Sequence, residues 1–248
     1  MRKSILTLGI AAVLTGVLAT CSMTYAADDE LAQIQESGKL KVGVEGTYPP
    51  YTYHDDNGEL TGFDVEVAKA IADKLGVEAD FTESDWDSLL AGIDSGRLDT
   101  VINAVSITPE REEKYDFAGP YFYITQQIVV AKDNDDIVDM ASLDGKKVAN
   151  TATTAYLDIL EDAGASLVQI STADEAVSLI ESGRADFTTF NSVVFNEYLQ
   201  QHPDANLKVA FVIPDVVDTY AVPIKKGETA LYDACLLYTS PSPRDGAT

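Results

Sequence analysis

The chain has 248 residues, of which 46% are hydrophobic, and its formal net charge is −24. This length and this apolar content allow one large domain or two small domains with a substantial core. The excess of acidic residues argues against nucleic acid and anionic membranes as partners, because phosphate groups are bound by Lys and Arg.

Residues 1–26 have the features of a secretory signal peptide. A basic start is followed by an apolar run from Ile5 to Ala19, which is too short to span a bilayer comfortably and precedes small residues. Cleavage after Ala26 is the preferred prediction, and a lipoprotein signal with Cys21 acylated is the alternative. In both cases we expect the protein to work outside the cytoplasm, as a periplasmic or extracellular protein.

Residues for metal or thiol chemistry are scarce in this sequence. Its two cysteines are Cys21 and Cys235, and its two histidines, His54 and His202, stand apart in polar stretches. The motifs Cys-x-x-Cys, His-Glu-x-x-His and Gly-x-Ser-x-Gly are absent. We therefore expect no metal site and no cofactor, and no internal disulfide once Cys21 leaves with the signal peptide.

From residue 38 onwards, strand and helix signals alternate. An apolar residue at every fourth position predicts a helix over 63–75, which Gly76 is placed to end. A short helix is predicted around 89–93, and Thr108-Pro109 begins another, since Thr suits the N-cap and Pro the first turn. The predicted strands and extended segments are 40–44, 51–54, 60–63, 100–104 and 121–130, with the hairpin signal Asn57-Gly58 between the second and the third.

Two short motifs of the first half recur in the second half. Residues 38–42, Gly-Lys-Leu-Lys-Val, are echoed by residues 145–148, Gly-Lys-Lys-Val, and residues 94–99, Asp-Ser-Gly-Arg-Leu-Asp, by residues 181–186, Glu-Ser-Gly-Arg-Ala-Asp. In each copy of the second motif, a short helix is predicted to end at the Gly and a strand to follow. Together with the alternating pattern, the recurrence predicts two similar α/β lobes.

The carboxyl ends of the predicted strands carry the polar and aromatic residues of interest. Strands followed by helices imply parallel pairing, and ligands then bind beyond the carboxyl ends of the strands. The segments in question are 45–48, 103–106, 151–154 and 191–192. Two lobes that face each other across a cleft would bring all of these segments to one ligand.

Arg111 lies in the first turn of the helix predicted after Thr108. The free N–H groups and partial positive charge of a helix N-terminus attract an anion, and a guanidinium grips a carboxylate at two points. Ser106 adds a hydroxyl just before this turn. These residues predict a site for an α-carboxylate. The alternative is that Arg111 pairs with Glu112 or Glu113 on the surface.

Tyr48 and Trp86 are aromatic residues in loops that follow strands, and Trp86 is the single tryptophan of the chain. Aromatic residues in such loops form flat walls for the apolar part of a ligand. Packing against the core is the commoner role of a lone aromatic residue. The residues alone leave both interpretations open.

Two long stretches carry a resemblance to a known family. They read VGVEGTYPPYTYHDDNGELTGFDVEVAKAIADKLG and DWDSLLAGIDSGRLDTVINAVSITPEREEKYDFAGPYF, and weaker matches continue through SLDGKKVANTATTAYLDIL, ESGRADFTTFNSVVFNEYLQQHPD and YAVPIKKG. In order and spacing, these motifs resemble the family 3 (polar amino-acid type) extracellular solute-binding proteins of ABC importers. The resemblance extends to about Ala234, and residues 150–156 are most similar to the cystine-type branch.

The resemblance implies a two-lobed periplasmic-binding-protein-like fold of type II. Each lobe would hold a mostly parallel α/β sheet flanked by helices. The first lobe would comprise residues 38–123 with a return over 219–234, and the second would comprise residues 126–214. The two hinge crossings would lie near 122–127 and 213–219.

The same resemblance implies roles for individual residues. Tyr48 and Trp86 would be the aromatic walls, and Arg111 would hold the ligand carboxylate. Glu45 would meet the ligand side chain and suit a cationic or amide end. Further polar contacts would come from Asn103, Ser106, Thr153, Thr154, Asn191 and Ser192.

The sequence departs from the family pattern at two places. Family members carry an Asp in the second lobe that binds the α-ammonium group, and the matching residue here is Ser192. The ammonium would then rest on Asn191, Glu45 or backbone carbonyls, or the ligand is not a standard α-amino acid. The other place is 235–248, which shows no helical periodicity. We expect this tail to be foreign to the fold and Cys235 to have no structural role.

These observations predict an exported, monomeric binding protein, and not an enzyme, that passes a polar amino acid such as cystine to an ABC permease. Its mechanism would be hinge closure, favoured by contacts that the ligand makes with both lobes. One alternative is an enzyme on the same scaffold, of dehydratase or lytic transglycosylase type, with Glu45 as its candidate acid or base. The other is the ligand-sensing module of a receptor, which would need a transmembrane segment after the domain.

Overall fold

The computed structural model describes residues 30–239, so the expected signal peptide, with its Ala26 cleavage and Cys21 alternatives, lies outside the described residues. The helices are α1 (Glu30–Ser37), α2 (Phe63–Leu75), α3 (Trp86–Asp94), α4 (Pro109–Glu112), η1 (Met140–Leu143), α5 (Leu157–Asp162), α6 (Ala173–Glu181), α7 (Ser192–Gln201) and α8 (Thr229–Thr239). The strands are β1 (Lys39–Val44), β2 (Thr47–Tyr48), β3 (Thr52–His54), β4 (Leu60–Thr61), β5 (Glu78–Glu83), β6 (Thr100–Val101), β7 (Tyr115–Ala131), β8 (Lys147–Asn150), β9 (Ser166–Gln169), β10 (Thr188–Asn191) and β11 (Leu207–Lys225).

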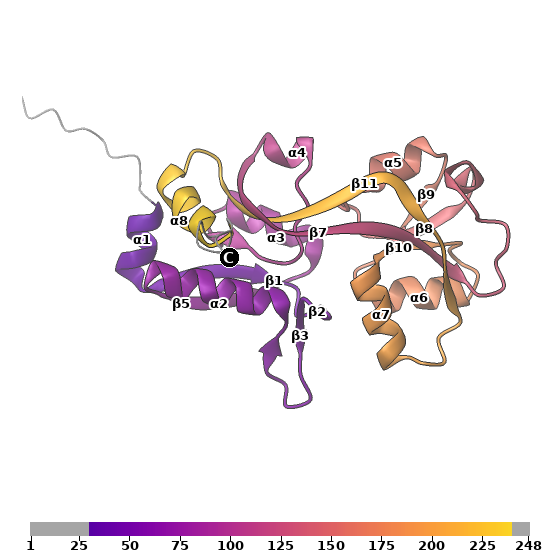
Figure 1. The fold of residues 1–248 in the computed structure, drawn as a ribbon, viewed down its shortest axis with the longest axis horizontal. Helices are drawn as coiled ribbons and strands as arrows, with labels where there is room; N and C mark the ends of the chain where they lie inside the picture. Colours follow the sequence, from indigo (N-terminus) through magenta and orange to yellow (C-terminus); the bar gives the residue numbers. More distant parts are fainter. Residues whose placement is uncertain (1–29, 240–248) are drawn as a thin grey trace, which may run out of the picture.

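Two long strands connect the two lobes of the molecule. β7 and β11 pair antiparallel and run side by side from one lobe into the other (Figure 1). Both belong to a six-stranded sheet with the order β10-β7-β11-β6-β1-β5. Pairing is parallel within the first lobe, between β1 and its neighbours β5 and β6, and within the second lobe, between β8 and β9. The two-lobed α/β fold is therefore confirmed, with antiparallel pairing added where the crossing strands join the sheet.

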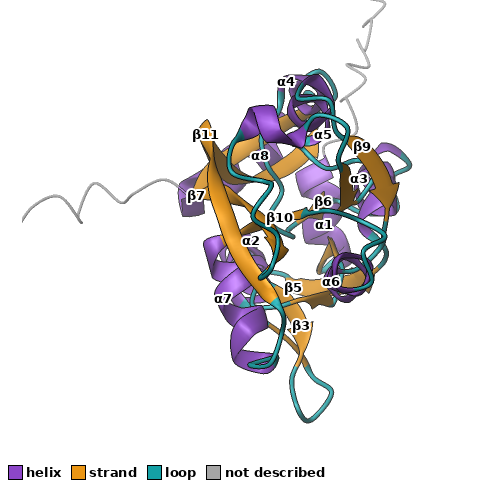
Figure 2. Ribbon diagram, turned by 90° about the vertical axis from the view of Figure 1, so that its right-hand side faces the viewer, coloured by secondary structure: helices purple, strands orange, loops and turns teal. Residues whose placement is uncertain are grey.

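The helices divide between the lobes. α1, α2, α3 and α8 lie around β1 and β5 in the first lobe, whereas α5, α6 and α7 lie with β8, β9 and β10 in the second (Figure 1). The predicted hairpin around Asn57-Gly58 is present as β3 and β4. It projects away from the rest of the first lobe (Figure 2). No helix within residues 30–239 combines the length and the apolar character that crossing a bilayer would require.

The α2 helix shows how local signals fix an element. Val67, Ile71 and Leu75 lie on one face and are buried in the core of the first lobe. Gly76 follows with φ 76°, and its backbone N–H donates to Ala72 and Asp73 carbonyls. This left-handed conformation favours glycine and closes the helix. The predicted bounds of 63–75 are confirmed.

The recurring motifs occupy equivalent places in the two lobes. α3 and α6 both end at a serine, Ser95 or Ser182, which is followed by a glycine with φ 69°. The aspartate three residues after each glycine then accepts a backbone N–H from a lysine of the other motif. Asp99 Oδ2 accepts from Lys41 N at 2.7 Å, and Asp186 Oδ2 accepts from Lys147 N at 2.7 Å.

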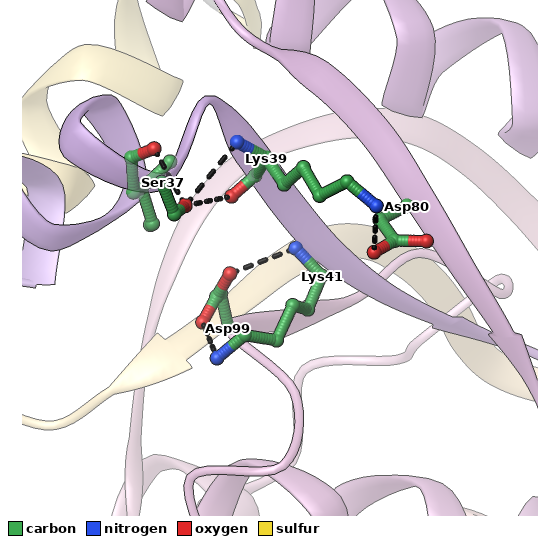
Figure 3. A network of polar contacts seen from close by, with 6 residues as sticks. Ser37, Lys39, Lys41, Asp80 and Asp99 are labelled. Atoms are coloured by element: carbon green, nitrogen blue, oxygen red, sulfur yellow. Dashed lines mark hydrogen bonds and ion pairs between the residues drawn. The ribbon is translucent and has the colours of Figure 1, made fainter.

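Asp99 belongs to a polar network at the start of β1 (Figure 3). It is 5% exposed and also forms an ion pair with Lys41 Nζ at 3.3 Å. Lys39 pairs with Asp80 of β5 at 3.0 Å on the exposed side. The echoed motifs thus tie a helix-to-strand turn to the adjacent parallel strand in each lobe.

Three expectations about elements need correction. The strand predicted over 100–104 ends at Val101, because Ala104 has φ 51° and turns the chain out of the extended conformation. The extended segment predicted from Tyr121 begins at Tyr115 and pairs with β11 along most of its length, with three register shifts.

The tail from Cys235 was also expected to be non-helical, but α8 continues to Thr239. Cys235 is 1% exposed and packs with Leu40 and Ile71 in the core of the first lobe. Cys235 therefore has a structural role, because its apolar side chain is packed in this core. Residues 240–248 lie beyond the described residues.

Candidate functional site

A cavity of about 120 Å³ lies between the two lobes. The first lobe contributes the residues that follow β1 and β6, and the second lobe contributes residues after β8 and β9 and along β10. Most of the predicted site residues line it, namely Glu45, Tyr48, Trp86, Asn103, Ser106, Arg111 and Thr154. Gln126 of β7 and Tyr220 of β11 add to the lining from the crossing strands.

Arg111 is the cation of this cavity and is only 8% exposed. Its Nη1 donates to the Ser106 carbonyl at 2.9 Å and its Nη2 to the Thr153 carbonyl of the second lobe at 2.8 Å. The guanidinium carbon lies 5.3 Å from the centre of the Trp86 ring, which adds a cation–π contact. The alternative of a surface pair with neighbouring glutamates is therefore wrong.

Within residues 30–239, no carboxylate forms an ion pair with Arg111. Burial lowers the pKa of Arg111, because water is withdrawn from the charged form. Buried charges are costly unless an opposite charge accompanies them. The cavity beside Arg111 therefore offers a favourable place for an opposite charge.

The helix N-terminus contributes less to anion binding than the sequence suggested. α4 has four residues, and its N–H groups are largely used locally. Thr108 Oγ1 accepts the N–H of Arg111 at 3.3 Å, and the Thr108 carbonyl accepts the N–H of Glu112 at 2.9 Å. Pro109 has no N–H. The guanidinium is thus the principal group for holding an anion, and Thr108 caps the turn that carries it.

Asn103 and Glu45 form one unit at the first-lobe wall. The Asn103 Oδ1 atom accepts from Glu45 N at 2.9 Å and from Thr52 Oγ1 at 2.7 Å. Its Nδ2 donates to Glu45 Oε2 at 2.6 Å. The side chain of Asn103 therefore holds the Glu45 carboxyl in place and keeps little capacity for a ligand.

Glu45 brings a titratable group to the cavity. Burial raises its pKa to about 7, the hydrogen bond from Asn103 opposes this rise, and the charges of Asp85 and Asp87 add to it. A carboxyl in this state can donate or accept a hydrogen bond at neutral pH. It becomes a carboxylate when a cation approaches.

The two predicted aromatic walls differ in their surroundings. The ring of Tyr48 stacks on Tyr51 at 5.5 Å between centroids, and Tyr51 is a fully buried core residue. Trp86 packs beside the core around Leu89 while it also contacts Arg111. Both rings line the cavity. Each ring therefore packs against protein groups while it also forms part of the cavity lining.

Asn191 and Ser192 do not line the cavity. Asn191 is fully buried and is the N-cap of α7, where its Oδ1 accepts from Val194 N at 2.9 Å. Its Nδ2 donates to the Tyr220 hydroxyl at 2.9 Å. Ser192 is the first residue of α7. The Asn191 side chain is thus used to cap α7 and to hold the Tyr220 hydroxyl. In this structure it does not face the cavity.

Asp218 is an important residue that sequence reasoning missed. It lies in the β11 crossing, is 6% exposed and accepts from Ser106 Oγ at 3.0 Å and Gln126 Nε2 at 3.2 Å. The Tyr156 hydroxyl of the second lobe also donates to it. An aspartate inside the apolar run Val216 to Ile224 was the available signal. Asp218 therefore links both lobes through the hinge.

A second link between the lobes lies at the rim of the cavity. Asp87 of α3 accepts from Thr153 N at 3.1 Å and from Thr153 Oγ1 at 2.7 Å, and from Gln169 Nε2 at 3.2 Å. Thr153 thus accepts a hydrogen bond from Arg111 with its carbonyl and donates to Asp87 with its N–H and its hydroxyl. The lobes are in contact across the cavity in this structure.

The raised pKa of Glu45 predicts a pH dependence of stability. The folded protein keeps the Glu45 proton up to about pH 7, whereas the unfolded chain releases it near pH 4.5. The contribution of Glu45 to the free energy of unfolding is complete below pH 4.5 and is lost as pH rises through 7. Between these values the free energy of unfolding falls by up to about 1.4 kcal/mol per pH unit. Glu45→Gln is expected to remove this part of the slope in urea unfolding of the ligand-free protein. Equal slopes for both proteins would contradict the assignment.

An interlobe cavity with one buried, unpaired arginine and two aromatic walls is typical of a protein that encloses a small anionic solute. Comparison with known proteins gives the class. Residues 40–237 match the model of the bacterial extracellular solute-binding proteins, family 3. The chain belongs to this family.

Individual relatives of known type indicate the kind of solute-binding protein that this chain resembles. A probable amino-acid ABC transporter-binding protein of Haemophilus influenzae is 37% identical over 93% of this chain and 88% of that protein. The L-cystine-binding protein TcyA of Bacillus subtilis is 38% identical over 94% of this chain and 89% of that protein. The L-arginine-bound structure of the amino acid ABC transporter substrate-binding protein AbpA of Streptococcus pneumoniae has a TM-score of 0.78 and 29% identity, with coverage of 84% of this chain and 90% of that chain.

Proposed function

We propose that this protein captures an amino acid outside the cytoplasm and delivers it to an ABC permease. The observation that carries the proposal is Arg111, a buried guanidinium without an ion pair in residues 30–239, which faces a cavity between two lobes. The α-carboxylate of an amino acid supplies the missing negative charge and suits the two-point geometry of a guanidinium.

The rest of the ligand would extend along the cavity from Arg111. Trp86 and Tyr48 provide flat surfaces for its apolar part. Glu45 provides a carboxyl for a polar or cationic end. The α-ammonium group would lie near Gln126 and Tyr220 of the crossing strands, with Thr188 and Thr189 on β10, the strand that pairs with β7.

Closure of the lobes would couple binding to transport. Arg111 and Asp87 of the first lobe both contact Thr153 of the second. A ligand on Arg111 that also touches Thr154 favours the arrangement in which these contacts form, because a ligand shifts a conformational equilibrium only through differential contacts. The permease would then recognise the closed protein, which we expect to act as a monomer exported by residues 1–26.

A binding role is favoured over catalysis by the chemistry of the lining. Glu45 is the carboxyl that lines the cavity among residues 30–239, and Asn103 holds it. An acid–base reaction at this place would need a second titratable group of matched pKa. An enzyme of dehydratase or transglycosylase type is therefore the less favoured proposal.

A ligand screen tests the proposed function. L-cystine, L-arginine, L-histidine, L-glutamine and L-glutamate are each added to the purified protein, and Tm and Trp86 fluorescence are recorded. We expect at least one of them to raise Tm in a concentration-dependent manner, since a ligand that binds only the folded state stabilises it. The amine that lacks the α-carboxylate, such as agmatine in place of arginine, serves as the matched control. Equal effects of agmatine and arginine, or no effect of any amino acid, would refute the proposal.

The Asp87 contact predicts a change in release rate. Asp87→Ala removes the acceptor for Thr153 and Gln169, so the closed state loses contacts that the open state does not make. The ligand dissociation rate is expected to rise about three- to tenfold, a modest effect because the three hydrogen bonds that are lost are exposed to solvent. Stopped-flow fluorescence of Trp86 measures this rate. Asp85→Ala is the control, since Asp85 precedes the same helix and its side chain does not cap it. Identical release rates for the two variants would contradict the role of Asp87.

A further inference from the structure

Ala104 is an unusual residue in the wall of the cavity. Its φ is 51°, and Asp215 is the other residue besides glycine with a positive φ within residues 30–239. Side chains with a Cβ atom disfavour this left-handed region. Such a conformation persists only where the surrounding structure enforces it, and it is frequent at functional sites.

A buried carboxylate enforces the conformation of Ala104. Asp64 Oδ2 accepts the Ala104 N–H at 2.5 Å, and the Asp64 side chain is fully buried. Burial raises the pKa of Asp64 to about 7, while the Ala104 N–H and the Tyr121 hydroxyl oppose the rise. The Asp64 carboxyl is therefore held in a place that costs free energy, next to the one strained residue of the cavity wall.

Ala104 lies in the sequence between Asn103 and Ser106, which hold the side chains of Glu45 and Arg111. Asn103, directly before it, holds the Glu45 carboxyl through its Nδ2 atom. Ser106, two residues after it, accepts Nη1 of Arg111 with its carbonyl. A change of φ at Ala104 would rotate these two residues relative to each other. The distance and angle between Glu45 and Arg111 thus depend on the Ala104 conformation.

The position of Asp64 in α2 offers a simpler explanation. Acidic residues in the first turn stabilise a helix through its N-terminal N–H groups and dipole. Asp64 does lie in the first turn of α2, and its own N–H donates to the Tyr51 carbonyl at 3.0 Å. Its Oδ2 atom, however, bonds to a residue 40 positions away in sequence, outside α2. The Asp64 side chain therefore bonds to the cavity wall and not to the N-terminal N–H groups of its own helix.

We propose that Asp64 is a positioning residue of the ligand site: its carboxylate holds the left-handed backbone of Ala104 and thereby sets Asn103 and Ser106, which carry Glu45 and Arg111. This inference rests on the proposed function in so far as it takes the cavity as the place where the amino acid binds. Asp64 does not itself line that cavity.

Two substitutions of Asp64 separate its hydrogen bond from its charge. Asp64→Asn keeps an acceptor oxygen of nearly the same shape, and Asp64→Ala removes it. Asp99→Ala is the matched control. Asp99 is also a buried carboxylate that accepts a backbone N–H, from Lys41, and it lies away from the cavity.

Ligand affinity is measured by titration calorimetry with L-cystine and with L-arginine separately. In Asp64→Ala the left-handed backbone of Ala104, which binding requires, becomes a minor state. Kd is therefore expected to rise about five- to thirtyfold, because this factor is the equilibrium constant that corresponds to the free-energy cost of the left-handed conformation for a residue with a Cβ atom. Asp64→Asn and Asp99→Ala should stay within about threefold of the wild type. Ala104→Gly in the Asp64→Ala background should recover most of the loss, because glycine adopts this φ without strain.

The Ala104 amide proton gives a readout that needs no ligand. In nuclear magnetic resonance spectra we expect Asp64→Ala to shift this resonance and to speed its hydrogen exchange, whereas Asp64→Asn and Asp99→Ala leave it protected. An unchanged Ala104 amide in Asp64→Ala, wild-type affinity in that variant, or equal losses in Asp64→Asn would overturn the proposal. If no amino acid of the screen binds the wild type, the proposed function fails, and the amide measurement still decides the role of Asp64.

Discussion

Arg111→Ala is expected to weaken amino acid binding by about hundredfold or more. The variant removes the cation that pairs with the ligand carboxylate, and truncation of one partner of a buried charge pair costs about 2–5 kcal/mol. It also removes the donors to the Ser106 and Thr153 carbonyls, so one contact between the lobes is lost with it. Titration calorimetry with the best ligand of the screen measures the change.

Arg97→Ala is the control for Arg111→Ala. Arg97 is exposed, and its Nη2 donates to the Ser88 carbonyl at 3.4 Å outside the cavity. This variant should bind the ligand with wild-type affinity. Circular dichroism should show both variants folded, because Arg111 makes no ion pair with another described residue. Wild-type affinity in Arg111→Ala would remove the basis of the proposed site.

Asp218→Ala is expected to lower the free energy of unfolding by about 2–4 kcal/mol. Three donors, Ser106 Oγ, Gln126 Nε2 and the Tyr156 hydroxyl, lose their common acceptor, and each unsatisfied buried group costs about 1 kcal/mol or more. Because the donors come from both lobes and the hinge, the variant should also bind ligand more weakly. Urea unfolding and calorimetry measure the two effects.

Asp218→Asn and Asp135→Ala complete this experiment. Asp218→Asn keeps one acceptor oxygen and should lose less stability than Asp218→Ala. Asp135 is exposed and pairs with Lys208 on the surface, so its removal should change stability little. A loss in Asp218→Ala no larger than in Asp135→Ala would show that the hinge network does not contribute.

Most of the fold was readable from local sequence signals. The four-residue spacing of Val67, Ile71 and Leu75 predicted α2, and Gly76 predicted its end. Both signals could be recognised because they depend only on residues close together in the sequence. The repeated Ser-Gly-Arg motifs gave the equivalence of α3 and α6. In each lobe, the motif ends in an aspartate that ties the turn to a neighbouring strand.

The hinge network was not readable in the same way. Asp218 meets Ser106 only because β11 crosses beside β6, 112 positions later in the chain. Such a contact depends on how strands pair over long distances, which local pattern does not specify. Asn191 illustrates the opposite case. Its position at the carboxyl end of β10 suggested a ligand contact, but an asparagine before a helix also suits an N-cap, and this second role is the one observed.

The tail was misjudged for a related reason. The lack of helical periodicity from residue 235 onwards predicted a non-helical tail, and this stretch also contains Pro241 and Pro243. Proline disrupts the helix at and just before its own position, and α8 ends at Thr239, ahead of both. The burial of Cys235 in the first-lobe core follows from tertiary packing of α8 against β7 and α2, which the residues of the tail do not reveal by themselves.

A crystal structure of the protein with its best amino acid ligand tests the central claim most directly. The account predicts lobes closed over the ligand, with both carboxylate oxygens within hydrogen-bonding distance of the Arg111 guanidinium and the side chain directed toward Glu45. A ligand bound outside the interlobe cavity, or one whose carboxylate lies away from Arg111, would contradict the account.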